Sequence, residues 1–226
     1  MLEILCEMET LSSDNLRVQL PKAVDAIRGP NDLVEQVLSR QSFLSKTGDE
    51  MIEGYSAQIY LILNQLSTNF AGRDSLENNS PILSFSDFGP HNLVWEPLEN
   101  QFFAVDLEFF GTDDRHKLIG DTILHPQTSW TPHLLEKFLT GAQDAIGTSG
   151  SQLDDLLPLL SLKWATIVLA KLVRDGSKDL QNYDHEQSSV ETLIEHYIRM
   201  AGMKSAEDIL DSVCSRDGVV QDRSQP

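Results

Sequence analysis

Residues 85–92 read Phe-Ser-Asp-Phe-Gly-Pro-His-Asn, and they lie where the hydrophobic pattern of the chain changes. Before them, apolar residues recur every three or four positions in 31–44 and 48–66, which predicts two amphipathic helices. After them, strand-like apolar runs flank the turn Pro97–Asn100, which predicts a β-hairpin over residues 92–108. Residues 85–92 are therefore expected to form a loop that leads into this hairpin.

The remaining chain reads as helix. Apolar periodicity and cap residues predict further helices at 1–11, 132–146, 153–174, 187–201 and 205–214. Strands and helices do not alternate as in a doubly wound sheet, so the expected fold class is α+β and predominantly α-helical. We expect a single domain over residues 1–215. It comprises a helical segment (1–80), the loop with the hairpin (81–126) and a helical subdomain (127–215). A polar tail follows at 216–226.

The composition is that of a water-soluble globular protein, with 40% hydrophobic and 23% charged residues. The formal net charge of −18 repels phosphate backbones and attracts cationic small molecules, so we expect no nucleic-acid partner. Cys6 and Cys214 form no disulfide or metal pattern, and no secretory signal is evident, which favours a cytoplasmic location. The apolar run Leu156–Val173 contains Pro158 and two lysines, which favours a buried helix over a membrane span.

The loop and the hairpin carry polar residues suited to phosphoryl transfer. That reaction needs a carboxylate to accept the proton of the attacking hydroxyl, oxygen ligands for Mg²⁺ and a cation near the phosphates. One placement takes Asp87-Phe88-Gly89 as the metal motif and Asp74 with Asn79 as the catalytic pair. Only seven residues then separate Asn79 from Asp87, which leaves no space for a strand, a turn and a second strand.

A second placement makes Asp87 the catalytic residue and Asn92 the first metal ligand. The hairpin then returns Asp106 towards the loop, so that Asn92 and Asp106 can share a cation. Glu108 follows two residues later, on the same face of an extended strand, and could support Asp106. This placement fits the spacing better. The plain alternative is that Asp87 caps a turn and Asp106 ends a strand.

A resemblance to a known family runs through three segments, Phe85–Asn92, Phe103–Asp114 and Lys117–Pro126. They are similar to the aminoglycoside phosphotransferase and choline kinase-like family, a group of small-molecule kinases with a protein-kinase-like fold. Residues 162–169 also resemble a helix in one bacterial branch of that family. The similarity is strong over about 81–126 and weaker over 127–175.

The resemblance implies roles for individual residues. Asp87 would be the catalytic base, Asn92 and Asp106 would be Mg²⁺ ligands, and ATP or GTP would donate the phosphoryl group. Asp121 would anchor the segment after the hairpin, or alternatively cap the start of a helix.

Two departures from the family pattern stand out. Phe85 occupies the position, two residues before the catalytic Asp, where the family usually has a His that braces the loop. In addition, the sequence contains no G-x-G-x-x-G, and Lys22 and Lys46 are the only lysines before Asp87. We therefore expect a protein-kinase-like C-terminal lobe whose N-terminal β-lobe, with its nucleotide-binding groups, is missing.

The expected function is transfer of a nucleotide γ-phosphate to a hydroxyl of a small molecule, with low or no turnover by this chain alone. One alternative is a truncated, non-catalytic remnant or a binding module on the same fold. Another is half of a split enzyme, whose partner chain supplies the N-terminal lobe and covers an apolar surface around Phe88, Leu107 and Phe109. No membrane partner is expected.

Three further polar residues are candidate substrate contacts. His91 lies inside the loop and could contact substrate or phosphate, or be solvated. Asp113 and Asp114 read as a solvated acidic loop that could help to bind a cationic substrate.

Overall fold

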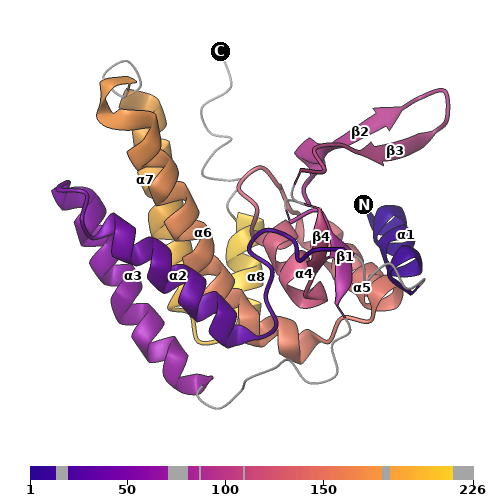
Figure 1. Cartoon of the computed structure of the whole chain (residues 1–226), viewed down its shortest axis with the longest axis horizontal. Helices are drawn as coiled ribbons and strands as arrows, with labels where there is room; N and C mark the ends of the chain where they lie inside the picture. Colours follow the sequence, from indigo (N-terminus) through magenta and orange to yellow (C-terminus); the bar gives the residue numbers. More distant parts are fainter. Residues whose placement is uncertain (14–19, 71–80, 87, 109, 180–183, 216–226) are drawn as a thin grey trace. The chain divides into compact units, whose positions relative to one another are not determined.

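The computed structural model describes the chain except residues 14–19, 71–80, 87, 109, 180–183 and 216–226, and describes no side chains within 175–189. The chain divides into two compact units (Figure 1). Unit 1 contains residues 1–28, 75–156 and 210–226, and unit 2 contains residues 29–74 and 157–209.

Unit 2 is built of helices. α2 (Pro30–Leu44) packs against α3 (Glu50–Asn69), and α3 contacts α7 (Asp184–Ala201). Most of α6 (Gly150–Asp179) and the start of α8 (Ala206–Ser215) also belong to this unit.

The helices predicted at 31–44 and 48–66 are confirmed as α2 and α3. Asp49 is the N-cap of α3, because its carboxylate accepts hydrogen bonds from two amides of the first turn. The buried side chains recur at helical spacing and so form the packed face of each helix. They are Leu33, Val37 and Leu44 in α2, and Ile52, Ile59 and Leu63 in α3.

A hydrogen bond from a tyrosine joins α3 to α7, and it leads us to expect that this tyrosine ionises only at high pH. The Tyr55 hydroxyl donates to Glu195 Oε1 at 3.0 Å. Desolvation, this hydrogen bond and the charges of Glu195 and Glu191 raise the pKa of Tyr55 to about 12. Because the neutral phenol is favoured in the folded state, its contribution to stability is present below about pH 10 and is lost as the pH rises towards 12.

The measurement is a tyrosinate absorbance titration of the chain and of its Tyr55→Phe variant, whose difference isolates Tyr55. We expect Tyr55 to ionise at about pH 12 and Glu195→Gln to lower its pKa. Ionisation of Tyr55 near pH 10, the ordinary value for tyrosine, would contradict the bond to Glu195.

Unit 1 contains two separate two-stranded antiparallel sheets. β2 (Leu93–Glu96) pairs with β3 (Gln101–Ala104), and Pro97–Asn100 forms the turn between them, so the predicted hairpin is confirmed. Its ladder is shorter than predicted, because β3 ends at Ala104 instead of continuing to residue 108. The hairpin projects as an arm from the rest of the unit (Figure 1).

The second sheet was not predicted. β1 (Ile82–Ser84) pairs with β4 (Gly111–Asp113), and the segment Pro21–Ala23 lies along the other side of β4. Thr112 donates its amide to the Pro21 carbonyl at 2.9 Å and accepts from the Ala23 amide at 3.0 Å. This backbone lies so close to Gly111 that a side chain at that position would collide with it.

Helix packing in unit 1 links this small sheet to the helices around it. α1 (Leu2–Ser13) packs against β1 and against α5 (Pro132–Ile146), and α4 (Arg115–Leu124) also contacts α5. The Ser12 hydroxyl accepts the Leu83 amide at 2.8 Å, which fixes α1 to the strand that leads into residues 85–92.

Part of α6 has the length and the apolar composition of a membrane-spanning helix. The stretch Gly150–Arg174 is long and apolar enough, and 61% of its apolar 18-residue window is buried in the structure. Core helices of water-soluble proteins have the same properties, so this helix is only weak evidence for a membrane.

Candidate functional site

The segments that carry the predicted site lie between the two sheets along the chain. The β1–β4 ladder ends at the pair Ser84 and Gly111, and the β2–β3 ladder begins at the pair Leu93 and Ala104. Between these pairs the strand pairing is interrupted, and this interruption is called the opening below. Residues 85–86 and 88–92 lie on one side of it, and residues 105–108 and 110 lie on the other. Because both ladders hold the two sides together, the structure brings the two predicted segments to one place. Asp87 and Phe109 lie outside the described residues.

Asn92 and Asp106 lie across the opening from each other. The Val105 amide donates to the Asn92 carbonyl at 2.9 Å, so Asp106 follows directly after the residue paired with Asn92. Asp106 has a positive φ of 61° and is exposed, whereas Asn92 is half-buried. The backbone thus places Asp106 one residue beyond the residue that pairs with Asn92.

The predicted face shared by Asp106 and Glu108 is wrong. That prediction assumed a strand in which alternate residues point the same way. β3 ends at Ala104, and the left-handed backbone of Asp106 breaks the alternation. Glu108 is exposed, and nothing in its backbone position assigns it to Asp106.

The start of the loop is held by aromatic packing and by a serine. Phe85 is buried, with its ring 6.0 Å from that of Phe88 and 5.4 Å from that of Phe110. Ser86 has a positive φ of 59°, which is uncommon for a residue with a side chain, and its hydroxyl donates to the Val24 carbonyl at 2.8 Å. Phe85 therefore braces this loop by apolar packing at the position where the resembling family has a His.

The end of the loop is a short turn. Pro90–Asn92 form a 3₁₀ turn in which the Asn92 amide donates to the Gly89 carbonyl at 3.0 Å. His91 is exposed, and its ring stacks on His125 with centroids 4.4 Å apart. The prediction left open whether His91 is solvated or contacts a substrate; the structure shows an exposed ring supported from one side.

The solvated-loop interpretation of Asp113 and Asp114 is wrong, because both residues are buried. Asp113 Oδ1 accepts the Ile27 amide at 3.0 Å, and its Oδ2 lies 2.5 Å from Lys117 Nζ. Asp114 is the N-cap of α4, since its carboxylate accepts the amides of His116 and Lys117. Both carboxylates are committed to internal hydrogen bonds, so we do not place them at a substrate site.

Lys117 lies between two carboxylates inside unit 1. Its ammonium is 2.5 Å from Asp113 and 3.2 Å from Asp121, and all three side chains are buried. Asp121 therefore anchors α4 from within the helix and is not its cap. Burial alone would lower the pKa of Lys117, but Asp121 and Asp113 outweigh that effect and raise it. Burial raises the pKa of Asp113, against the opposing effects of Lys117 and of the amides of Ile27 and Asp114.

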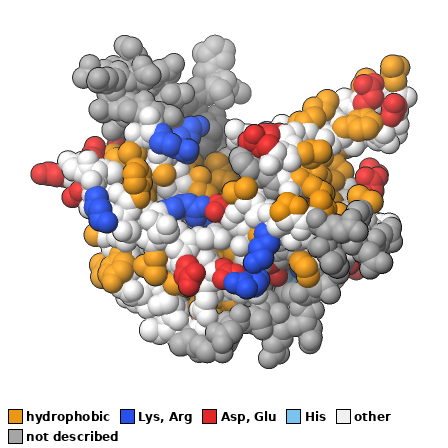
Figure 2. All heavy atoms as spheres, in the orientation of Figure 1, with side chains coloured by type: hydrophobic (Ala, Val, Ile, Leu, Met, Phe, Trp, Pro, Cys, Tyr) orange, Lys and Arg blue, Asp and Glu red, His pale blue; other side chains and the backbone are white. Residues whose placement is uncertain are grey.

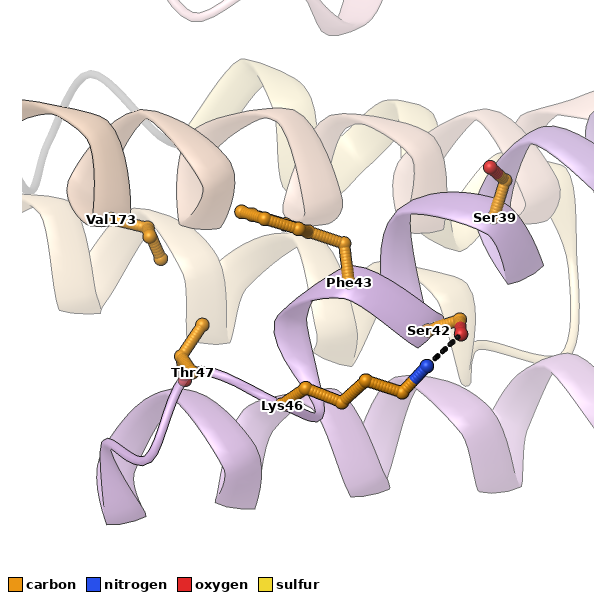
Figure 3. A pocket seen from close by; sticks show the side chains of 6 residues that line it. All are labelled: Ser39, Ser42, Phe43, Lys46, Thr47 and Val173. Carbon is orange, nitrogen blue, oxygen red and sulfur yellow. Dashed lines mark hydrogen bonds between the residues drawn. The ribbon is translucent and has the colours of Figure 1, made fainter.

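An open pocket of about 570 Å³ lies in unit 2. Figure 3 shows the Phe43 ring pointing towards Val173 and the Lys46 side chain reaching the Ser42 hydroxyl, at 3.3 Å. Ser39 and Thr47 complete the lining. None of these residues belongs to the predicted site.

The donor chemistry of the opening fits a hard cation. Asn92 and Asp106 offer amide and carboxylate oxygens, the ligand types that Mg²⁺ prefers. Among the described residues, His, Cys, Asp and Glu side chains form no group of three or more that could hold a metal. A metal site in this opening would therefore use the amide oxygen of Asn92 together with the carboxylate of Asp106.

Comparisons with known proteins give the fold. No family model and no curated protein matches the sequence. Among solved structures, the chain is similar to the crystal structure of choline kinase LicA from Streptococcus pneumoniae, with a TM-score of 0.51 and 15% identity. The match covers 86% of this chain and 62% of that kinase, so the chain spans less than two thirds of the kinase's length. The protein is mostly helical and has a choline kinase-like kinase fold.

Proposed function

We propose that this chain, with its choline kinase-like fold, is the acceptor-side and metal-side part of a small-molecule phosphotransferase. The observation that supports the proposal is that two ladders flank the segments carrying Asn92 and Asp106, and that the Val105 amide donates to the Asn92 carbonyl. The net charge of −18 favours a hydroxylated acceptor that is cationic. The donor would be ATP or GTP.

Each proposed residue has a separate task. Asp87 accepts the proton of the acceptor hydroxyl. Asn92 and Asp106 provide oxygens for Mg²⁺, which when bound would neutralise charge on the nucleotide phosphates. Phe85 and Ser86 hold the backbone on the N-terminal side of Asp87.

The test is a calorimetric titration of Mg²⁺-ATP, and then of Mg²⁺-GTP, into the full chain. A charged hydrogen-bond or metal contact contributes about 1.5–3 kcal/mol, so Asp106→Ala should weaken binding by about 10- to 100-fold. Glu99→Ala is the matched control, because Glu99 is an exposed carboxylate in the hairpin turn. Binding that is absent from the unaltered chain, or equal in the Asp106→Ala and Glu99→Ala variants, would refute the proposed metal site.

A second candidate is half of a split enzyme, and the hairpin favours it. Figure 2 shows hydrophobic side chains gathered along the projecting arm. Exposed large residues lie on both faces of the hairpin and just after it: Val94, Trp95, Leu98, Phe102, Phe103, Val105 and Leu107. A large exposed apolar surface is typical of an interaction site. The surface differs from the one predicted, because Phe88 is buried.

In the split-enzyme candidate, the partner chain supplies the cationic side chain that binds the nucleotide phosphates. Adding such a chain should raise Mg²⁺-ATP affinity, and Trp95→Ser together with Phe103→Ser should cancel the increase. If this chain alone binds and transfers phosphate, no partner is needed.

A further inference from the structure

The carbonyl of Phe88 is bound by a side chain from a distant helix. Thr122 of α4 is fully buried, and its hydroxyl lies 2.9 Å from the Phe88 carbonyl and 2.8 Å from the Leu118 carbonyl of its own helix. A threonine in a helix commonly donates to the carbonyl four residues before it. The additional approach to Phe88 ties the middle of the 85–92 loop to α4.

The same helix supports the loop at a second point. His125, at the C-terminal end of α4, is buried and stacks under the exposed ring of His91 at an interplanar angle of 16°. Its Nδ1 accepts the Gln127 amide at 3.1 Å, which fixes the ring and leaves the proton of the neutral form on Nε2.

Gly89 makes this stacked pair possible. A Cβ atom at position 89 would lie 2.7 Å from the His91 ring and 3.7 Å from His125. The absence of a side chain therefore lets the His91 ring lie directly over the backbone of Gly89.

We propose that Thr122 and His125 are positioning residues that hold residues 88–92 against α4, and thereby set the orientation of Asn92. Thr122 fixes the segment before the 3₁₀ turn, and His125 fixes the turn itself through His91. Neither side chain touches a substrate. The proposed function is needed only to explain why the orientation of Asn92 matters, namely for metal binding. The restraint on residues 88–92 is a property of the chain without ligand.

The test is amide hydrogen exchange of the full chain followed by NMR, without ligand. Asn92 and Leu93 donate their amides to Gly89 and Pro90 within the turn and report on its opening. We expect Thr122→Val to speed their exchange at least about tenfold, a typical effect of losing one buried hydrogen bond, and Thr122→Ser to restore it.

Thr166→Val is the matched control. Thr166 is equally buried, and its hydroxyl donates to Lys163 within its own helix at 2.7 Å. This variant should lose similar global stability without speeding exchange at Asn92. Equal exchange at Asn92 in the Thr122→Val and Thr166→Val variants would overturn the positioning role of Thr122.

A spectroscopic measurement tests His125 separately. His125→Ala should shift the ring-proton signals of His91 to the values of an unstacked imidazole, and His125→Phe should retain part of the stacking shift. Unchanged His91 signals in His125→Ala would overturn the role of His125. Because no nucleotide is present, a failure of Mg²⁺-ATP to bind would refute the proposed function and leave these results standing.

Discussion

Replacing Lys117 by Met is expected to destabilise the folded chain by about 3–5 kcal/mol. Lys117 is the cation between Asp113 and Asp121, and both carboxylates are buried. Removing it leaves two buried acidic groups without their counter-ion, and their charges then repel each other. Urea unfolding followed by circular dichroism would measure the loss of unfolding free energy.

Two variants separate the electrostatic cause from a general effect of the substitution. Lys46→Met removes an exposed lysine that contacts Ser42, and it should change stability by no more than about 0.5 kcal/mol. Adding Asp113→Asn and Asp121→Asn to Lys117→Met should recover much of the loss, because no buried charge then remains. A Lys117→Met variant as stable as Lys46→Met would contradict the buried ion triad.

Replacing Asp87 by Asn is expected to slow phosphoryl transfer by about 10²- to 10⁴-fold while Mg²⁺-nucleotide binding stays unchanged. The amide keeps the size of the side chain but cannot accept the proton of the acceptor hydroxyl. The measurement is transfer of labelled γ-phosphate under single-turnover conditions to a panel of hydroxylated small molecules, cationic ones included.

The control for this prediction is Asp144→Asn, which alters an exposed carboxylate on α5. It should behave as the unaltered chain. Transfer by Asp87→Asn at the unaltered rate would exclude Asp87 as the base. A chain that binds Mg²⁺-ATP but transfers to none of the acceptors would favour the split-enzyme candidate.

The sequence predicted those parts of the fold that depend on local pattern. Helix α3 begins at the N-cap Asp49, helix α5 begins after Thr131, and both carry apolar faces at helical spacing. The hairpin was predictable because its strands are neighbours in the chain and its turn is short.

The parts that were missed depend on distant contacts. β4 forms because β1 and the Pro21–Ala23 backbone flank it, and neither partner is close in sequence. Asp113 and Asp114 look like surface residues from the local sequence. Lys117 follows Asp113 by four positions and precedes Asp121 by four, so the cation at the start of α4 lies between an acid at the end of β4 and an acid within the helix. No pattern in the sequence indicates the contact between Thr122 and Phe88.

The two ladders close very different lengths of chain, and this sets an order of assembly. β2 and β3 are joined by four residues, so this hairpin can form within about 1–10 μs. β4 is instead fastened by contacts such as the one from Ile27 to Asp113, which spans 86 positions. Closing such long loops costs more chain entropy and slows folding. Refolding is therefore expected to form the β2–β3 hairpin well before it completes the opening around Asn92 and Asp106.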